Sequence, residues 1–294
     1  MTSKTVLIAG CGYVGSALAC ELQKRGHAVW ALRRSKPALK DLSAIGIQSV
    51  QADITKPETL KNLPKTDWVV ICVSPNERSP EAYRKTYIEG VGNLIRVGAG
   101  FKPAPTIKRI LYISSTSVYG QKNGEWVDEN SPVEPEHETG KILLEAEKQV
   151  LHSGVPAVIF RLGGIYGAGR NRITFLKQNT EEIAQGQDYI NLIHVADIVS
   201  GAILLLERGK SGEVYLGVDD EPVTRKEYFS EISCLLGIPP PVFAGHKEES
   251  FVTGRTNKRC RNEKLKALGF EFKYPSFREG YRELISAEHL ADSV

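Results

Sequence analysis

The chain has few of the residues that metal, disulfide or membrane chemistry requires. Its five cysteines are odd in number and form no Cys-x-x-Cys pair, which predicts reduced thiols in a cytoplasm. Its six histidines show no metal-ligand spacing, so no metal is expected. No apolar run approaches the roughly 20 residues that span a bilayer. Met-Thr-Ser-Lys enters the first expected strand directly, leaving no room for a signal peptide.

The chain also lacks a large excess of either sign of charge. Lys and Arg number 38 against 35 Asp and Glu, for a net charge of +3. There is no basic block, so nucleic acid is not predicted as a partner. With 41% hydrophobic and 25% charged residues, the composition is that of a globular protein. A chain of 294 residues is long enough for one large domain or for a main domain with a smaller one.

Glycine is placed where it is most informative, directly after the first apolar run. The loop Gly10-Cys11-Gly12-Tyr13-Val14-Gly15 follows an expected strand and opens a helical stretch. In such a unit the first glycine permits a tight turn, the second lets the backbone approach a pyrophosphate, and the third allows close helix packing. The helix N-terminus then faces the phosphates. These six residues predict a dinucleotide site.

The second expected strand ends in Leu32-Arg33-Arg34, where an NAD site usually carries an acid for the ribose 2′-hydroxyl. Two guanidinium groups suit a 2′-phosphate, because they stay charged and chelate its oxygens. The alternative interpretation is that Arg33 and Arg34 are solvated loop residues. We therefore predict NADP as cofactor, with NAD as the alternative.

Apolar strands alternate with helical stretches along most of the chain. This order predicts an α/β fold with a doubly wound parallel sheet. Expected strands are 5–9, 28–32, 47–51, 68–73, 109–114, 157–161 and 213–216, and the clearest helices are 14–25, 80–97, 140–152 and 195–207.

The character of the sequence changes after Val218. Thr224 and Glu227 form an expected capping box that opens a helix. Three prolines at 239–241 are expected to be followed by a basic, loop-rich tail. We predict a dinucleotide-binding domain of residues 1–164 with 192–218, and a smaller substrate lobe of residues 165–191 with 219–294.

Further segments carry a family resemblance that covers nearly the whole chain. They are Ala52-Asp53-Ile54, Asn93, Ile-Ser-Ser-Thr-Ser-Val-Tyr-Gly at 113–120, Arg-Leu-Gly-Gly-Ile-Tyr-Gly at 161–167 and Ile-His-Val-Ala-Asp-Ile at 193–198. Together with the glycine loop they resemble the short-chain dehydrogenase/reductase superfamily in its extended, epimerase/dehydratase-like form, and the glycine spacing resembles the atypical branch. The resemblance implies a Rossmann-type sheet with a small C-terminal substrate lobe. Asp53, Ile54 and Val73 complete the expected cofactor residues.

In this family a Ser or Thr, a Tyr and a Lys carry out the proton chemistry while nicotinamide takes or gives hydride. Ser115 matches the serine. The tyrosine is missing: if Lys141 is the family lysine, the tyrosine position holds His137. In the register that we prefer, in which a glycine and a glutamate of the motif fall into place, Thr139 replaces the tyrosine and Leu143 the lysine.

Other proton-transferring groups are possible in place of the missing tyrosine. His137 is a candidate because an imidazole titrates near neutrality, and Tyr119 and Tyr166 are landmark tyrosines that either transfer a proton or only pack. Thr116 and Ser117 stand where dehydratase relatives carry an acid pair, which makes sugar dehydration an unfavoured reaction. Asp197 is expected to have a structural role at a helix start.

Two functional hypotheses follow from this resemblance. The first is an NAD(P)-dependent oxidoreductase or epimerase that acts on a hydroxyl or carbonyl of a small-molecule substrate, for which a nucleotide-linked sugar is one candidate. The second is a sensor that binds NADP(H) without turnover, which the missing tyrosine–lysine pair favours. We prefer the enzyme, because the Ser115 segment is retained as well as the cofactor loop. The tail cations Lys258, Arg259 and Arg261 either meet an anionic substrate or are solvated. The family resemblance implies a homodimer that forms through the helices at 80–97 and 140–152.

Overall fold

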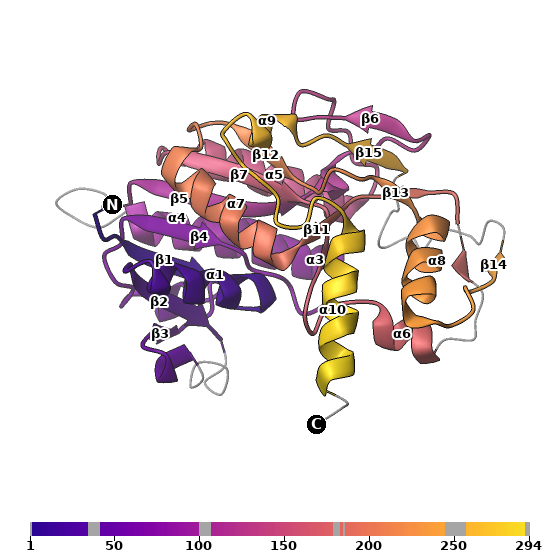
Figure 1. Ribbon diagram of the computed structural model, residues 1–294. Helices are drawn as coiled ribbons and strands as arrows, with labels where there is room; N and C mark the ends of the chain where they lie inside the picture. The colour runs from indigo at the N-terminus through magenta and orange to yellow at the C-terminus, as the bar shows by residue number, and fades with distance from the viewer. Residues whose placement is uncertain are drawn as a thin grey trace.

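Seven parallel strands form the central sheet (Figure 1). The computed structural model describes residues 2–34, 42–99, 107–178, 183–184, 186–244 and 257–291. Across the sheet the strands are β12 (Val214–Gly217), β7 (Ala157–Leu162), β5 (Arg109–Ser115), β4 (Trp68–Ile71), β1 (Thr5–Ala9), β2 (Ala28–Arg33) and β3 (Gln48–Gln51). All seven predicted strands are present, with ends shifted by no more than two residues. The predicted α/β fold class is confirmed.

Alternate side chains of the strands face two separate apolar layers. In β1, Val6 and Ile8 belong to one cluster, whereas Leu7 and Ala9 belong to the other. The first layer is closed by α1 (Tyr13–Lys24) and α7 (Val195–Arg208), the second by α4 (Val91–Ala99) and α5 (Glu138–Leu151). Because helices cover both faces, β4 and β7 are buried at every position, as is typical of parallel sheets.

The order of the strands places a ligand crevice beside β1. This strand lies between β4 on one side and β2 on the other, so successive crossovers leave it in opposite directions. Open α/β sheets bind their ligands outside the carboxyl ends of the strands at such a switch point. The glycine loop directly follows β1 and therefore lies at this crevice.

The helix predicted over 80–97 is present, but it is not uniform. It consists of α3 (Pro80–Tyr83), the π-helical segment η2 (Arg84–Gly90) and α4. The side chain of Ser79 caps its start by accepting a hydrogen bond from the Ala82 amide. A single helical period does not predict the extra residue that a π segment inserts.

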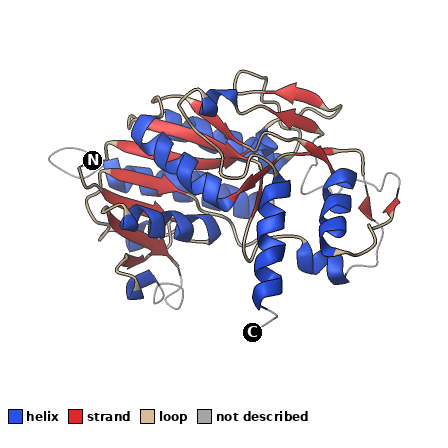
Figure 2. Ribbon diagram, viewed as in Figure 1, coloured by secondary structure: helices blue, strands red, loops and turns tan. Residues whose placement is uncertain are grey.

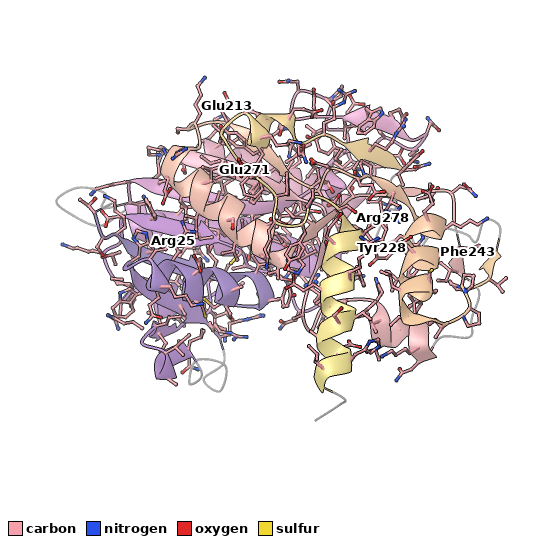
Figure 3. All side chains as sticks on the ribbon, in the orientation of Figure 1. Arg25, Glu213, Tyr228, Phe243, Glu271 and Arg278 are labelled. Atoms are coloured by element: carbon pink, nitrogen blue, oxygen red, sulfur yellow. The ribbon has the colours of Figure 1, made fainter. Side chains whose placement is uncertain are left out.

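A third apolar cluster lies beside the sheet, between α6 (Ile173–Gln178), α8 (Arg225–Leu236) and α10 (Phe277–Ala291) (Figures 1 and 2). Tyr228 of α8 and Arg278 of α10 lie where these two helices face each other (Figure 3). The Arg278 guanidinium pairs with Glu231 of α8 at 2.7 Å. The predicted capping box at the start of α8 is also present, since Thr224 and Glu227 each bond the backbone of the other. The predicted division into two domains stays a prediction.

The expectation of a loop-rich tail is wrong for residues 257–291. This segment forms a strand, a short helix and α10. Within α10, Phe277, Tyr281 and Ile285 recur at every fourth position and are buried in the third cluster, which is a helical pattern. Residues 245–256 of the predicted tail lie outside the described residues.

The remaining elements are short. Pairs of strands are β6 (Glu125–Val127) with β15 (Lys258–Cys260), β8 (Gly164–Tyr166) with β11 (Leu192–His194), β9 (Ile183–Ala184) with β14 (Phe243–Ala244), and β10 (Tyr189–Ile190) with β13 (Val223–Thr224). Short helices are η1 (Pro57–Leu60), η3 (Thr116–Val118) and α9 (Glu263–Lys266). Among the described residues, no helix combines the length and the apolar character that a membrane crossing requires.

Candidate functional site

The glycine loop is packed so tightly against β4 that two of its glycines cannot be replaced without displacing backbone. Gly10 has a φ of +95°, and a Cβ on it would lie 2.6 Å from the Cys72 carbonyl oxygen. A Cβ on Gly15 would collide with the Gly10 carbonyl oxygen and lie 2.9 Å from the Cys72 Sγ. Gly12 differs, because it is exposed and a Cβ there would meet nothing within 4 Å. The space above Gly12 is therefore open to a ligand.

A cavity of about 220 Å³ lies over this loop at the carboxyl ends of β1, β2 and β4. Eight predicted cofactor residues line it, namely Gly10, Cys11, Gly12, Arg33, Arg34, Asp53, Ile54 and Val73. Sequence reasoning missed the other lining residues, namely Leu32, Ala52, Thr55, Cys72, Ser74 and Thr86. We call this cavity the glycine-loop pocket.

Side chains around the glycine-loop pocket fix its rim. The Asp53 carboxylate accepts hydrogen bonds from the amide and the hydroxyl of Thr55, at 2.9 and 2.8 Å. Asn93 of α4 donates to the Ile54 carbonyl at 3.0 Å, which ties the segment after β3 to the helix layer. Arg34, which also lines the pocket, donates to the Asn76 side chain at 2.5 Å.

The pocket fits the phosphates and adenosine end of a dinucleotide. Its floor is backbone approached closely by glycine, and its walls hold cationic side chains and one carboxylate. The two thiols that line it are not anionic at neutral pH, because burial raises the pKa of Cys11 to about 12 and that of Cys72 well above its usual value. When bound, a nicotinamide dinucleotide would supply or accept a hydride.

Three residues of the predicted cofactor set do not line this pocket. Val14 packs into the first apolar layer, and Gly15 lies against the backbone of Gly10. Tyr13 points away from the pocket, and its hydroxyl donates to the Ala168 carbonyl at 2.9 Å.

A second, larger cavity of about 620 Å³ holds Ser115, and we call it the Ser115 cleft. It lies between the carboxyl ends of β5 and β7 and the third apolar cluster, and Tyr166, Tyr228 and Tyr281 contribute to its wall. Four cationic side chains line it and no described lining residue is a carboxylate; the cations are Arg170, Arg172, Arg225 and Lys258. The local potential of such a cleft attracts anions.

An aromatic ring lies beside the guanidinium group of two of these arginines. The guanidinium of Arg172 lies 5.7 Å from the centre of the Phe175 ring, and that of Arg225 lies 5.7 Å from the Phe229 ring. Lys258 is the most buried cation of the cleft, at 4% exposure. Burial lowers its pKa, with Cys260 opposing the shift. The neighbouring tail cations Arg259 and Arg261 do not line the described cleft. Arg261 lies over the exposed Trp126 ring, and Arg259 lies between this ring and that of Tyr189.

The start of α5 lies against the turn at residues 115–117, where β5 ends and η3 begins. A Cβ on Gly140 would be 3.0 Å from the Ser117 carbonyl oxygen, and the Ser115 hydroxyl oxygen accepts from the Ser117 amide at 3.2 Å. Thr139 and His137 precede this contact and are half-buried, but neither lines the described cleft. Lys141 is exposed and pairs with Glu138 at 2.8 Å.

Tyr119 lies outside both cavities and its hydroxyl is engaged on both sides. It donates to the Asp128 carbonyl and accepts from the Arg161 guanidinium, each at 2.8 Å. Burial raises its pKa above the usual range. Arg161 is in turn paired with Glu147 at 2.7 Å, in a buried network that includes Ser114. These contacts give Tyr119 a structural role next to β5.

His194 and Asp197 fix the wall behind Tyr166. The His194 Nδ1 accepts from the Ala196 amide and caps α7, and burial lowers the pKa of this imidazole to about 4. The Asp197 carboxylate accepts from the amides of Lys273 and Tyr274, at 2.7 and 3.1 Å. Asp197 thus anchors the segment that leads into α10, as its expected structural role predicts.

A glycine loop at the switch point of a doubly wound sheet, beside a cleft with a hydroxyl group, defines the class of dinucleotide-dependent α/β enzymes. Residues 6–216 match the model of the NAD dependent epimerase/dehydratase family. The chain therefore belongs to this family, which confirms the resemblance. It also confirms the prediction of an enzyme of the epimerase/dehydratase type.

Proteins of known sequence or structure are similar over nearly the whole chain. Protein YeeZ of Escherichia coli K12 is 29% identical over 282 residues, covering 92% of this chain and 97% of YeeZ. A Methylobacillus flagellatus structure assigned as an NAD-dependent epimerase/dehydratase has a TM-score of 0.78 and 30% identity, covering 98% of this chain and 100% of that one. MoeE5 in complex with UDP-glucose and NAD shares the fold, with a TM-score of 0.79 and 22% identity over 98% of this chain and 99% of MoeE5.

Proposed function

We propose that this protein is an NADP(H)-dependent oxidoreductase or epimerase that acts on a hydroxyl or carbonyl group of an anionic substrate, of which a nucleotide-linked sugar is the leading candidate. The observation that carries the proposal is the lining of the Ser115 cleft, with four cations and no carboxylate among its described lining residues. One guanidinium group can bind two oxygens of a phosphate through two parallel hydrogen bonds. MoeE5, which shares the fold, was solved with UDP-glucose and NAD.

Turnover of nucleotide sugars tests this directly. The purified protein is incubated with NADPH or NADP⁺ and a panel that contains UDP-glucose, dTDP-glucose and the corresponding uncharged sugars. Nicotinamide absorbance reports net oxidation or reduction, and NMR of the sugar reports epimerisation. We expect turnover of charged members only. Turnover of the uncharged sugars alone would contradict an anionic substrate, and cofactor binding with no turnover of any member would favour the sensor hypothesis.

The preference for NADP rests on Arg33 and Arg34, which both line the glycine-loop pocket after β2. A charge-assisted hydrogen bond contributes about 1.5–3 kcal/mol. The double variant Arg33→Ala/Arg34→Ala should therefore bind NADP⁺ about tenfold to a hundredfold more weakly in calorimetry. NAD⁺ affinity should change little, because NAD⁺ lacks the 2′-phosphate. Arg208→Ala, on an exposed position of α7, is the matched control, and equal losses for both cofactors would overturn the assignment.

We assign Ser115 to the reacting oxygen. Its Oγ accepts from the Ser117 amide, so its hydroxyl hydrogen can point to a substrate carbonyl or hydroxyl. In the reductive direction, the carbonyl carbon gains a hydride and its oxygen gains a proton. We propose His137 as the source of this proton. It directly precedes α5, whose start packs against the Ser117 carbonyl, and an imidazole can donate a proton whereas the hydroxyl of Thr139, in the expected tyrosine position, cannot. Because His137 does not line the cleft, the proton has to pass through a bridging water.

Two variants separate these roles. Ser115→Ala should lower kcat by about a hundredfold while NADPH affinity stays within about twofold, since the hydroxyl acts on the substrate oxygen. His137→Gln should lower kcat by a similar factor, because it removes the proposed proton source. His152→Gln, at the other end of α5, controls for loss of an imidazole. If His137→Gln retains the wild-type kcat, the proton comes from another group.

A further inference from the structure

The phenol of Tyr13 joins the glycine loop to the Ser115 cleft. Tyr13 is the first residue of α1, yet its side chain does not line the glycine-loop pocket. Its hydroxyl donates to the Ala168 carbonyl at 2.9 Å, across 155 residues of sequence. Partial burial raises the pKa of the phenol, so the hydroxyl remains a hydrogen-bond donor at neutral pH.

Ala168 lies at the tip of a tight turn between Gly167 and Arg170. The two end residues exchange backbone hydrogen bonds of 2.9 and 3.0 Å. Gly167 has a φ of +151°, and a Cβ on it would lie 2.6 Å from the Tyr13 hydroxyl. The guanidinium of Arg170 lies 5.7 Å from the centre of the Tyr13 ring. One side chain from the glycine loop thus contacts the beginning, the tip and the end of this turn.

Arg170 belongs both to the turn at 167–170 and to the lining of the Ser115 cleft. It is one of the cations that line the Ser115 cleft, and it is exposed. We propose that Tyr13 is a positioning residue that holds the turn at 167–170, presents Arg170 to the anionic group of the substrate, and couples cofactor binding at the glycine loop to order in the cleft. The part that concerns the substrate rests on the proposed function, whereas the coupling requires only the cofactor.

The physical basis of the coupling is the shared backbone of Tyr13. Dinucleotide phosphates bind at the N-terminus of the helix that follows a glycine loop, which is where the Tyr13 main chain lies. A ligand that fixes this main chain lowers the entropy that the phenol loses when it bonds Ala168. By linkage, an anion that orders the turn strengthens cofactor binding by the same factor.

Hydrogen exchange of the full chain tests the coupling without a substrate. The amides of Gly167 and Arg170 form the turn's two hydrogen bonds and serve as probes. We expect NADP⁺ to slow their exchange in the wild type and not in Tyr13→Phe, which keeps the ring and loses the hydroxyl. Without cofactor, exchange in Tyr13→Phe should be about threefold to tenfold faster, as expected for one hydrogen bond. Tyr215→Phe, whose hydroxyl accepts from the Lys210 amide elsewhere, is the matched control.

Inorganic pyrophosphate tests the positioning of Arg170. Its affinity is measured by calorimetry in saturating NADP⁺, so that the glycine-loop pocket is filled. We expect Tyr13→Phe to weaken binding about threefold and Arg170→Gln about tenfold. The double variant should bind no more than about twofold more weakly than Arg170→Gln alone, because Tyr13 acts through Arg170. Arg208→Gln controls for loss of a surface charge.

The outcomes are distinguishable. Multiplicative losses in the double variant, or protection of the turn by NADP⁺ in Tyr13→Phe equal to that in the wild type, would overturn the role of Tyr13. Absence of protection at the glycine-loop amides of the wild type would overturn the proposed cofactor site instead. If pyrophosphate does not bind the wild type, the anionic substrate is contradicted while the exchange data still decide on the coupling.

Discussion

The glycine-loop pocket and the Ser115 cleft differ in what they are made of. The end of β2, the short segments that directly follow β1 to β4, and Thr86 of η2 form the first, and its tightest contacts are those of glycine with backbone. Charged and aromatic side chains from distant parts of the chain form the second, with arginines held by rings. Backbone recognises a group that does not vary, such as a pyrophosphate, whereas side chains set selectivity for a variable substrate.

The difference also has an energetic side. Backbone contacts of the glycine loop belong to the fold and cannot be lost without displacing β4. The cleft cations, in contrast, lie in the turn at 167–170, directly before α6, and at the first residues of α8 and β15. Perturbations of the shared framework should therefore damage both cavities, and perturbations of the cleft side chains should damage one.

The largest effect is expected at the buried Glu147–Arg161 pair, which joins α5 to β7 in the sheet that carries both cavities. The two side chains are 2% and 5% exposed, and Glu147 also accepts from Ser114 at 2.5 Å. Glu147→Ala leaves the Arg161 charge buried without its partner, which costs about 3–5 kcal/mol of the free energy of unfolding. Denaturant unfolding measures this loss.

A matched control is Glu145→Ala on the same helix, whose ion pair with Arg84 is exposed. It should change stability by less than about 1 kcal/mol. If Glu147→Ala unfolds at the wild-type denaturant concentration, the pair does not stabilise the contact between α5 and the sheet.

The second effect is a dependence of stability on pH that arises at the wall of the Ser115 cleft. Burial lowers the pKa of His194 to about 4, so the unfolded chain binds more protons than the folded one between this value and the usual one near 6.5. Stability should therefore be lost as pH falls from about 6.5 to about 4, by about 3 kcal/mol for this group. His194→Asn keeps a side chain that can cap α7 and does not titrate.

Urea unfolding at several pH values in this window checks the sign. The difference in stability between wild type and His194→Asn should move in favour of the variant as the pH falls. A constant difference across the window would contradict the assignment of acid sensitivity to the wall behind Tyr166.

The two cavities also differ in how far sequence predicted them. All seven sheet strands and the glycine loop are local patterns of one segment each, so they were readable without the fold. Arg170 and Arg172 follow the landmark at 161–167, but nothing local shows that they meet Arg225 and Lys258. The tail cations Lys258, Arg259 and Arg261 were expected either to meet the substrate together or to be solvated together. Only Lys258 lines the described cleft, because successive residues of a strand face opposite sides.

At two further places the structure differs from the sequence-based prediction for a local physical reason. Tyr13 was assigned to the cofactor by its place in the motif, but its side chain contacts the turn at 167–170, where its hydroxyl donates to the Ala168 carbonyl. The helix α10 was overlooked although Phe277, Tyr281 and Ile285 carry its apolar stripe. The prolines and basic residues before it suggested a loop, which shows that composition is a weaker guide than period.

The third prediction compares glycines within the glycine-loop pocket. Gly15→Ala places a Cβ against the Gly10 carbonyl and should destabilise the fold by about 1–3 kcal/mol, as overpacking does, along with loss of cofactor binding. Gly12→Ala meets no protein atom within 4 Å. It should therefore keep the wild-type melting temperature and still weaken NADP⁺ binding, because the methyl group takes up the space of the pyrophosphate. Equal melting temperatures for both variants would show that Gly15 is not a packing position.

The smallest effect is expected at Arg172, on the cleft side of the comparison. Its guanidinium is exposed and lies over the Phe175 ring, so Arg172→Gln should leave stability and NADP⁺ affinity unchanged. Pyrophosphate affinity in saturating NADP⁺ should fall about threefold to tenfold, and its dependence on salt should become weaker, since one charge less attracts the anion. Calorimetry at two salt concentrations measures both, with Arg208→Gln as control. A loss of NADP⁺ affinity in Arg172→Gln would contradict the separation itself, because it would mean that the cleft side chains also hold the cofactor.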